Sequence, residues 1–274
     1  MQIAGTIAQA RALFDVLPRP LGFIPTMGAL HGGHLALVRR ARAESVAVAA
    51  SVFINPLQFG PGEDLERYPR DFEGDQAKLA QAGVDVLFAP SLVAMYPPGF
   101  SSSVEVGPIA GVYEGAARPA HFRGVATVVC KLLNVVRPDM LYLGQKDAQQ
   151  TAVIRKMIVD LEIPVSLTIV PTERESDGLA MSSRNAYLSA EEREAAPSLH
   201  HALQALRMAM AMGKSKADAI AAARTRLHPL AQLDYLDVVD ANTFVPIETL
   251  SPPAFVVGAA HFGNTRLLDN LWIE

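Results

Sequence analysis

Short apolar runs alternate with helical periodicity through the first two thirds of the chain. Apolar runs of about four to eight residues predict strands, and apolar positions that recur every three or four residues predict helices. The predicted strands are 21–24, 46–53, 84–89, 139–143 and 165–170. Helices are predicted over 1–17, from about 34, from about 72, over 123–136 and over 148–161. Apolar strands separated by helices indicate a parallel sheet that is covered on both faces.

The pattern changes after about Glu175, where a polar loop leads into alanine-rich helices. Helices are predicted over 190–211 and 216–227, and strands over 233–239, 254–262 and 265–272. We therefore predict an α/β fold with two domains. Residues 1–175 form a Rossmann-like parallel sheet with helices on both faces, and residues 176–274 form a smaller α+β domain that closes over the active site.

Polar clusters follow the ends of the predicted strands. They are Pro25–His34, Asn55–Gly62, Gly144–Gln150 and Thr172–Arg184. Ligands of parallel sheets bind at the carboxyl ends of the strands, so we expect these four loops to meet at one crevice.

His31 and His34 stand at the start of the second predicted helix, on one face because they are three residues apart. Unpaired backbone N–H groups and the helix dipole favour an anion there, and nearby glycines let the backbone approach it. The pair therefore predicts a phosphate site. In an arbitrary H-x-x-H the alternative is two surface histidines at a helix cap.

Two later clusters offer further phosphate donors. Lys146 follows a strand and opens a helix, where a cation is unfavourable unless an anion is bound as well. Asp147 beside it is a plausible helix cap. Ser182, Ser183 and Arg184 supply two hydroxyls and a guanidinium, although such a string in isolation is typical of a linker.

Two amides, Asn55 and Gln58, follow the strand 46–53 and suit a ligand with hydroxyl and carboxylate groups. The alternative for them is turn chemistry. Arg118 and His121 precede the helix 123–136, where they hold an anion or cap the helix. The charged segment 64–70 is either a lid or a solvated loop.

The composition narrows the chemistry. With 274 residues, of which 50% are hydrophobic, the chain can bury a sizeable core, and a net charge of −4 gives no general attraction to nucleic acid or membrane. Cys130 is the one cysteine, which excludes an intrachain disulfide; we expect a buried structural thiol in a reducing compartment. We find no G-x-S-x-G elbow, Walker P-loop, zinc spacing or membrane-spanning run.

The segment Pro25–His34 resembles the H-x-G-H signature of the nucleotidyltransferase superfamily, which class I aminoacyl-tRNA synthetases share. Together with 53–59, 121–124, 144–147 and 181–185, it closely resembles the pantothenate synthetase (pantoate–β-alanine ligase) family over essentially the whole chain. One departure is Gly32, where this family commonly has glutamate. We expect a slightly looser turn there.

The resemblance implies ATP-dependent condensation of pantoate with β-alanine, through pantoyl adenylate, in pantothenate biosynthesis. It also implies Mg²⁺ bound mainly through the nucleotide phosphates and a homodimer. From the charge balance, the single cysteine and the hydropathy pattern we expect a cytoplasmic protein with no nucleic-acid or membrane partner. The implied catalytic residues are His31, His34, Lys146, Ser182 and Arg184. The implied ATP contacts are Met27, His34, Gly144, Lys146, Asp147, Ser182, Ser183 and Arg184. Pantoate would be held by Pro25, Met27, Asn55, Gln58 and Gln150, with Arg118 and His121 in a neighbouring supporting role.

Three alternatives fit the pattern less well. An enzyme that moves AMP onto a phosphate acceptor needs cations where Asn55, Gln58 and Gln150 offer neutral amides. A catalytically silent nucleotide-binding module does not need the histidine, lysine and arginine all at strand ends. A nucleic-acid-binding protein needs a basic and aromatic surface pattern that is absent from the sequence.

Overall fold

The computed structural model describes residues 1–274, and its contacts divide the chain into two units. The first unit comprises Met1–Gly144 and Val153–Val170, and the second comprises Gln145–Ala152 and Pro171–Glu274. The hydrophobic pattern of the sequence does not predict that Gln145–Ala152 belongs to the second unit. The domain division near Glu175 stays a prediction.

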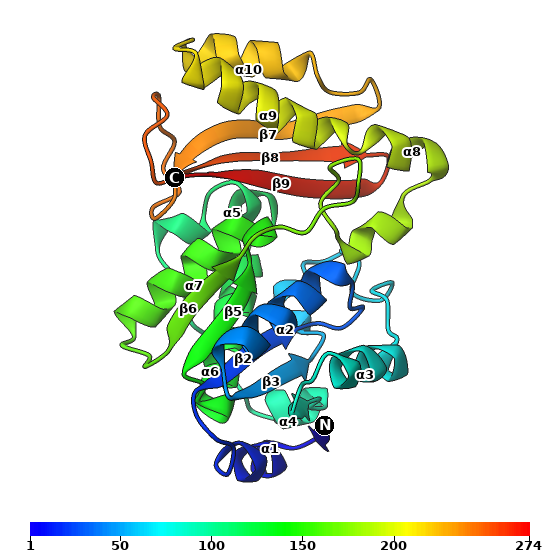
Figure 1. The fold of residues 1–274 in the computed structure, drawn as a ribbon, viewed down its shortest axis with the longest axis vertical. Helices are drawn as coiled ribbons and strands as arrows, with labels where there is room; N and C mark the ends of the chain where they lie inside the picture. Colours follow the sequence, from blue (N-terminus) through cyan, green and yellow to red (C-terminus); the bar gives the residue numbers. More distant parts are fainter. The chain divides into compact units, whose positions relative to one another are not determined.

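From the N-terminus to Val170, helices and strands alternate (Figure 1). The elements are β1 Gln2–Ala4, α1 Ile7–Phe14, β2 Leu21–Thr26, α2 Gly32–Glu44, β3 Ala47–Val52, η1 Pro56–Gln58, α3 Phe72–Gln81, β4 Val86–Phe88, α4 Leu92–Met95, η2 Pro108–Ala110, α5 Glu114–Ala117, α6 His121–Val136, β5 Met140–Gly144, η3 Gln145–Asp147, α7 Ala148–Asp160 and β6 Ser166–Val170.

The six strands form one parallel sheet in the order β1-β4-β3-β2-β5-β6, which confirms the predicted fold class. The chain runs outward from β2 through β3 to β4, and then returns to place β5 on the other side of β2. The strand order therefore reverses between β2 and β5. In open α/β sheets this switch point is where ligands bind, outside the carboxyl ends of the strands.

Burial on both faces explains the continuous apolar runs. Phe23 and Ile24 are consecutive residues of β2 and both are fully buried. Helix α2 covers one face, where Leu37 and Val38 share a core cluster with Ile24 and Leu87. This packing fixes the start of α2 against the end of β2.

Most boundaries differ from the prediction by one or two residues, and three differences have a structural cause. The predicted strand 21–24 continues in the structure through Pro25 to Thr26. Strand β2 is paired on both sides only at Gly22 and Phe23. The N–H that Pro25 lacks is therefore not needed for a second ladder of hydrogen bonds. The helix expected from about 34 begins at Gly32. The segment 1–17 also contains β1, a three-residue strand too short for its periodicity to be seen.

The second unit contains an antiparallel sheet in the order β7-β8-β9. Its remaining elements are η4 Ser183–Tyr187, α8 Ala190–Ala195, α9 Ser198–Ala211, α10 Lys216–Arg224, β7 Ala231–Asp240, β8 Ala254–Phe262 and β9 Thr265–Ile273. Helix α9 packs on this sheet through Leu203 and Leu206, and α10 packs on α9 (Figure 1). The single helix predicted over 190–211 is wrong, because Pro197, which has no N–H to donate, separates α8 from α9.

Cys130 in α6 is half-buried, so the expectation of a buried thiol is also wrong. Partial burial still raises the pKa of the thiol. The side chain lies beside Asn134, whose amide Nδ2 donates to the Cys130 carbonyl at 2.9 Å.

Candidate active site

The two histidines cap helix α2 for each other. His31 is the N-cap residue and lies outside the first turn, whereas His34 is the third residue of the helix. Nδ1 of His31 accepts the Gly33 N–H at 3.2 Å, and Nδ1 of His34 accepts the His31 N–H at 3.3 Å. The ring centroids lie 4.2 Å apart. Both bonds form with glycine at residue 32, where the family commonly has glutamate.

These two bonds select the tautomer of both rings. A neutral imidazole carries one proton, and a nitrogen that accepts a hydrogen bond cannot hold it. The proton of each neutral ring therefore sits on Nε2, which makes Nε2–H of His31 and Nε2–H of His34 donors. A pair of N–H donors at a helix N-terminus is suited to a phosphate.

The backbone amides of the loop from β2 to α2 donate to side chains. The Gly28 N–H donates to Oγ1 of Thr26 at 3.2 Å, and the Ala29 and Leu30 N–H groups donate to the two carboxylate oxygens of Asp75, at 2.7 Å each. These three amides are therefore occupied, whereas the anion site expected at the N–H groups of the first turn of α2 stays a prediction. We did not predict a role for Asp75, because it lies in a different helix, α3. The helix dipole alone explains an acidic residue in the first turn.

The amides Asn55 and Gln58 lie together with Met27, and both amide residues are buried. Nδ2 of Asn55 donates to Oε1 of Gln58 at 3.1 Å and to the Gly124 carbonyl at 3.0 Å. Oδ1 of Asn55 accepts from the Tyr96 hydroxyl at 2.8 Å. Nε2 of Gln58 lies 3.1 Å from Sδ of Met27. This arrangement fixes the side-chain orientation of Gln58.

Gly124 allows helix α6 to touch the turn η1. A Cβ built at Gly124 would overlap the carbonyl of Leu57. No larger residue fits without moving the turn that carries Gln58. The sequence shows this glycine only as part of the string 121–124.

Arg118 and His121 also hold the backbone at Gln58. Nη2 of Arg118 donates to the Gln58 carbonyl at 3.2 Å, and Nδ1 of His121 donates to the same oxygen at 2.8 Å. Since Nδ1 carries the proton, Nε2 of His121 accepts from Nη1 of Arg118 at 3.2 Å. The arginine is in turn bound by both carboxylate oxygens of Glu63. Burial, followed by the charge of Arg118, lowers the pKa of His121 to about 4.

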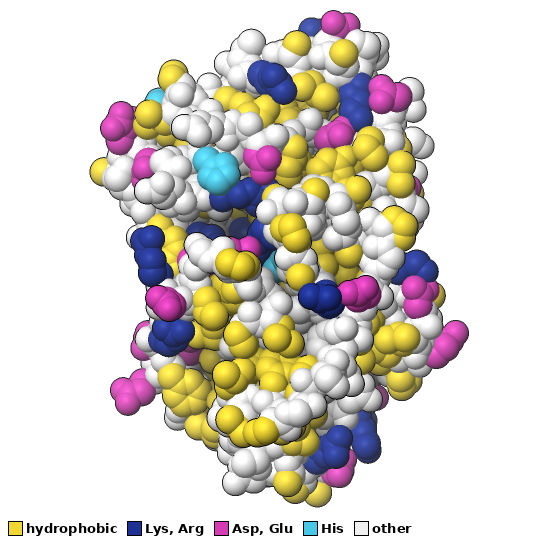
Figure 2. Space-filling model, turned by 180° about the vertical axis from the view of Figure 1, so that it is seen from behind, with side chains coloured by type: hydrophobic (Ala, Val, Ile, Leu, Met, Phe, Trp, Pro, Cys, Tyr) yellow, Lys and Arg dark blue, Asp and Glu magenta, His cyan; other side chains and the backbone are white.

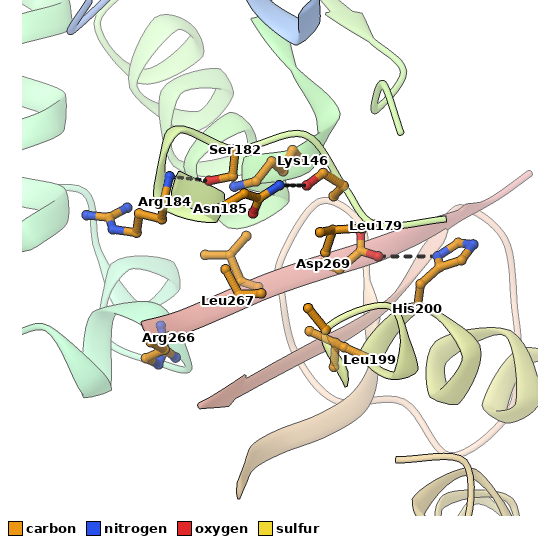
Figure 3. A pocket seen from close by; sticks show the side chains of 13 residues that line it. Lys146, Leu179, Ser182, Arg184, Asn185, Leu199, His200, Arg266, Leu267 and Asp269 are labelled. Carbon is orange, nitrogen blue, oxygen red and sulfur yellow. Dashed lines mark hydrogen bonds and ion pairs between the residues drawn. The ribbon is translucent and has the colours of Figure 1, made fainter. Parts of the chain in front are cut away.

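In the second unit, Lys146, Ser182 and Arg184 line one pocket (Figure 3), and their role as phosphate contacts stays a prediction. Ser182 is the N-cap of η4, and its Oγ accepts the Arg184 N–H at 3.3 Å. Arg266 and His200 line the same pocket, and Asp269 is its carboxylate. Arg266 is bound by Asp234, at 2.7 Å from Nη2 to Oδ2, and the pocket lining itself has three cationic side chains and one carboxylate, which suits an anion.

The remaining predicted residues take different places. Asp147 follows Lys146, and its Oδ1 lies 3.5 Å from Nζ of that lysine. Ser183 begins η4, and Gln150 lies in the first turn of α7. Gly144 ends β5, and Pro25 lies inside β2.

Strand β9 holds the turn that carries Lys146. Nδ2 of the buried Asn270 donates to the carbonyls of Gln145 and Lys146 at 2.9 and 2.8 Å. Nε2 of Gln145 donates back to Oδ1 of Asn270 at 3.1 Å. The turn η3 is therefore bonded to a strand more than a hundred residues away.

The preceding residue of β9, Asp269, binds the loop that leads to Ser182. Its oxygens accept from Nη1 and Nη2 of Arg174 at 2.7 and 2.9 Å, and Nδ1 of His200 lies 3.3 Å away. Burial alone would raise the pKa of Asp269, but hydrogen bonds from His200 and Arg174 lower it below its usual value. We did not predict Asp269 or Asn270; two adjacent polar residues in an apolar strand were the available signal.

Comparison with known proteins identifies the family. The sequence profile of a family described as pantoate-beta-alanine ligase matches residues 2–272. The chain belongs to this family. The match confirms the resemblance found in the sequence, and it makes the chain a ligase.

Individual members of the pantoate-beta-alanine ligase family are similar to this chain over nearly its full length. The pantothenate synthetase of Roseiflexus sp. (strain RS-1) is 51% identical, with 100% of both chains covered. The crystal structure of pantothenate synthetase from Thermus thermophilus has a TM-score of 0.95, 51% identity and 99% coverage of both chains. A pantoate-beta-alanine ligase from Francisella tularensis, complexed with beta-gamma ATP and beta-alanine, has a TM-score of 0.83 and 34% identity over 99% of this chain and 97% of that one.

We expect the His121 ring to stay neutral to about pH 4, because burial and Arg118 disfavour its protonated form. NMR of histidine-labelled protein, with His121→Asn to assign the signal, should give a midpoint near pH 4. The folded pKa lies below the usual 6.5, so the unfolded chain takes up the proton first and this contribution to stability is lost as pH falls from 6.5 towards 4. A midpoint at pH 6 or above would contradict the geometry.

Proposed function

We propose that this chain condenses pantoate with β-alanine through a pantoyl-adenylate intermediate. A carboxylate oxygen of pantoate attacks the α-phosphorus of ATP, and the bond to the bridging oxygen breaks to release pyrophosphate. The amine of β-alanine then attacks the acyl carbon, and AMP leaves. Full-length membership of the ligase family supports the overall reaction.

The observation that carries the proposal is the pair of Nε2–H donors at the start of α2. In our proposal the rings of His31 and His34 donate to α-phosphate oxygens, whose charge grows in the transition state. Donors fixed in advance stabilise such a state without rearrangement. No protein nucleophile takes part, so catalysis consists of positioning and electrostatics.

The pocket of the second unit would bind the far phosphates. Lys146, Ser182, Ser183 and Arg184 offer two cations and two hydroxyls, which complement the β- and γ-phosphates and the leaving pyrophosphate. Gly144 and Asp147 would contact the adenosine portion.

Magnesium would neutralise the triphosphate and would be held mainly by phosphate oxygens. The donor set of the pocket agrees with this assignment, because cations and hydroxyls complement phosphate better than they complement a metal ion. The ligand pair of the Francisella structure, ATP and β-alanine, supports the nucleotide and the amine substrate.

Pantoate would lie against Gln58 and Met27, with Pro25, Asn55 and Gln150 as further contacts. The amide of Gln58 offers donors and an acceptor for hydroxyl and carboxylate groups, and Met27 lies beside it, with Sδ 3.1 Å from Nε2 of Gln58. These neutral groups disfavour the alternative of AMP transfer to a phosphate acceptor. We also assign the chain to the cytoplasm, as the sequence indicates, and to a homodimer, as the resemblance implies.

Surface charge does not support a nucleic-acid partner. On the face in Figure 2, basic side chains are interspersed with acidic ones, in line with the net charge of −4. None of the helices has the length and apolar character needed to span a membrane.

We expect pyrophosphate to exchange into ATP in the presence of pantoate and magnesium, without β-alanine, because adenylation is complete before the amine reacts. Labelled pyrophosphate incorporated into ATP measures this exchange. Exchange that requires β-alanine, or no exchange with pure folded protein, would refute the adenylate mechanism.

We expect His34→Ala to lower turnover by ~10²-fold or more, since it removes one donor from the transition state. Steady-state kinetics with all three substrates measure the effect. His201→Ala, at an exposed histidine of α9, is the matched control and should keep full turnover. Full turnover of folded His34→Ala would leave this histidine with only a capping role.

A further inference from the structure

Asp75 is a buried carboxylate that the proposed reaction does not use directly. It lies in the first turn of α3, four residues after the N-cap Asp71, and is 1% exposed. A buried charge is unfavourable unless hydrogen bonds compensate it. The partners of this carboxylate therefore indicate what it does.

Both oxygens of Asp75 bind the loop that leads to the histidines. Oδ2 accepts the Ala29 N–H and Oδ1 accepts the Leu30 N–H, each at 2.7 Å. Lys78, one turn further along α3, donates from Nζ to the Leu30 carbonyl at 2.9 Å and lies 3.8 Å from Oδ1 of Asp75. Helix α3 thus bonds to both the amide and the carbonyl of Leu30.

The bonded loop has an unfavourable backbone conformation. Gly28 has φ of +86° and Ala29 has φ of +53°, both in the left-handed region. This region is unfavourable for alanine because its Cβ crowds the backbone. A Cβ at Gly28 would also lie 2.9 Å from Oδ2 of Asp75. The carboxylate supplies the bonds that compensate for this conformation.

The loop ends at the N-cap of α2. Leu30 immediately precedes His31, whose backbone N–H and ring form the two capping bonds with His34 and Gly33. A change in the backbone at Ala29 and Leu30 would therefore move both rings. Donors displaced by about 1 Å can lose about 10²-fold in rate.

We propose that Asp75 is a positioning residue for adenylation: its carboxylate fixes the left-handed loop, and the loop fixes the two Nε2–H donors. The inference rests on the proposed function. Because the carboxylate acts on ring placement, its loss should lower the rate constant of adenylation more than the apparent affinity for either substrate.

Asp75→Asn tests the proposal, because an asparagine amide can accept from one of the two N–H groups but opposes the other. We expect kcat of pantoate-dependent pyrophosphate exchange to fall about 10- to 100-fold, with KM for ATP and pantoate within about threefold. The matched control is Asp71→Asn, an exposed cap of the same helix whose Oδ1 accepts the Gly74 N–H. This control should retain the wild-type kcat.

NMR provides a readout that does not depend on activity. With ¹⁵N-labelled histidine, His31 and His34 should show the Nε2–H tautomer in the wild type and lose that preference in Asp75→Asn. The other histidine signals should stay unchanged. Wild-type tautomers and wild-type kcat in folded Asp75→Asn would overturn the proposal.

Ala29→Gly in the Asp75→Asn background provides a rescue, because glycine adopts the left-handed conformation without a steric penalty. We expect it to restore kcat about 5- to 10-fold relative to Asp75→Asn, with Ala29→Gly alone as reference. Absence of any rescue would contradict the role assigned to the loop conformation.

Gly28→Ala disturbs the same contact from the loop side, because its Cβ would lie 2.9 Å from Oδ2 of Asp75. It replaces Asp75→Asn as the test if that variant does not fold. It should lower kcat and disturb the two tautomers in the same way, and wild-type values for both would overturn the proposal. Failure of the proposed function is separate: it would appear as absent exchange in the wild type, whereas failure of this inference leaves wild-type exchange intact.

Discussion

The site depends on one constraint: backbone N–H groups between β2 and the first turn of α2 donate hydrogen bonds to side chains. In a P-loop, backbone N–H groups cradle the phosphate. Here the Ala29 and Leu30 amides donate to Asp75, and the His31 and Gly33 amides donate to ring nitrogens. Those bonds leave the proton of each neutral ring on Nε2, which makes each Nε2–H a donor. In the proposed mechanism the anion donors of this loop are therefore imidazoles, whose positions depend on the loop conformation.

The second unit uses a related arrangement. Asp269 and Asn270, adjacent in β9, bond respectively to Arg174 and to the turn that carries Lys146. In each unit a buried carboxylate on a regular element binds a loop that carries predicted phosphate contacts. A loop held by such bonds is pre-organised, which is what electrostatic catalysis requires.

The sequence predicted the parallel sheet well, because strands buried on both faces leave continuous apolar runs. Lys146, Ser182 and Arg184, which the sequence places after strands, line one pocket, and their role there stays a prediction. Asp75 could not be predicted, since its partners lie far away in the chain and an acidic residue is ordinary at a helix start. Asn270 was missed because its partners are equally distant, although two adjacent polar residues in an apolar strand were a signal. Pro25 was misjudged because strand pairing on one side carries β2 through it, and Pro197 was misjudged because the helical periodicity on both sides of it was taken as one helix.

Transfer of a single oxygen atom tests the chemistry most directly. If the carboxylate of pantoate attacks the α-phosphorus, pantoate labelled with ¹⁸O in its carboxylate should give AMP that carries one ¹⁸O per turnover, measured by mass spectrometry. Pyrophosphate should carry none. Label in inorganic phosphate or pyrophosphate, with unlabelled AMP, would show attack at another phosphorus and would contradict a site built around α-phosphate donors.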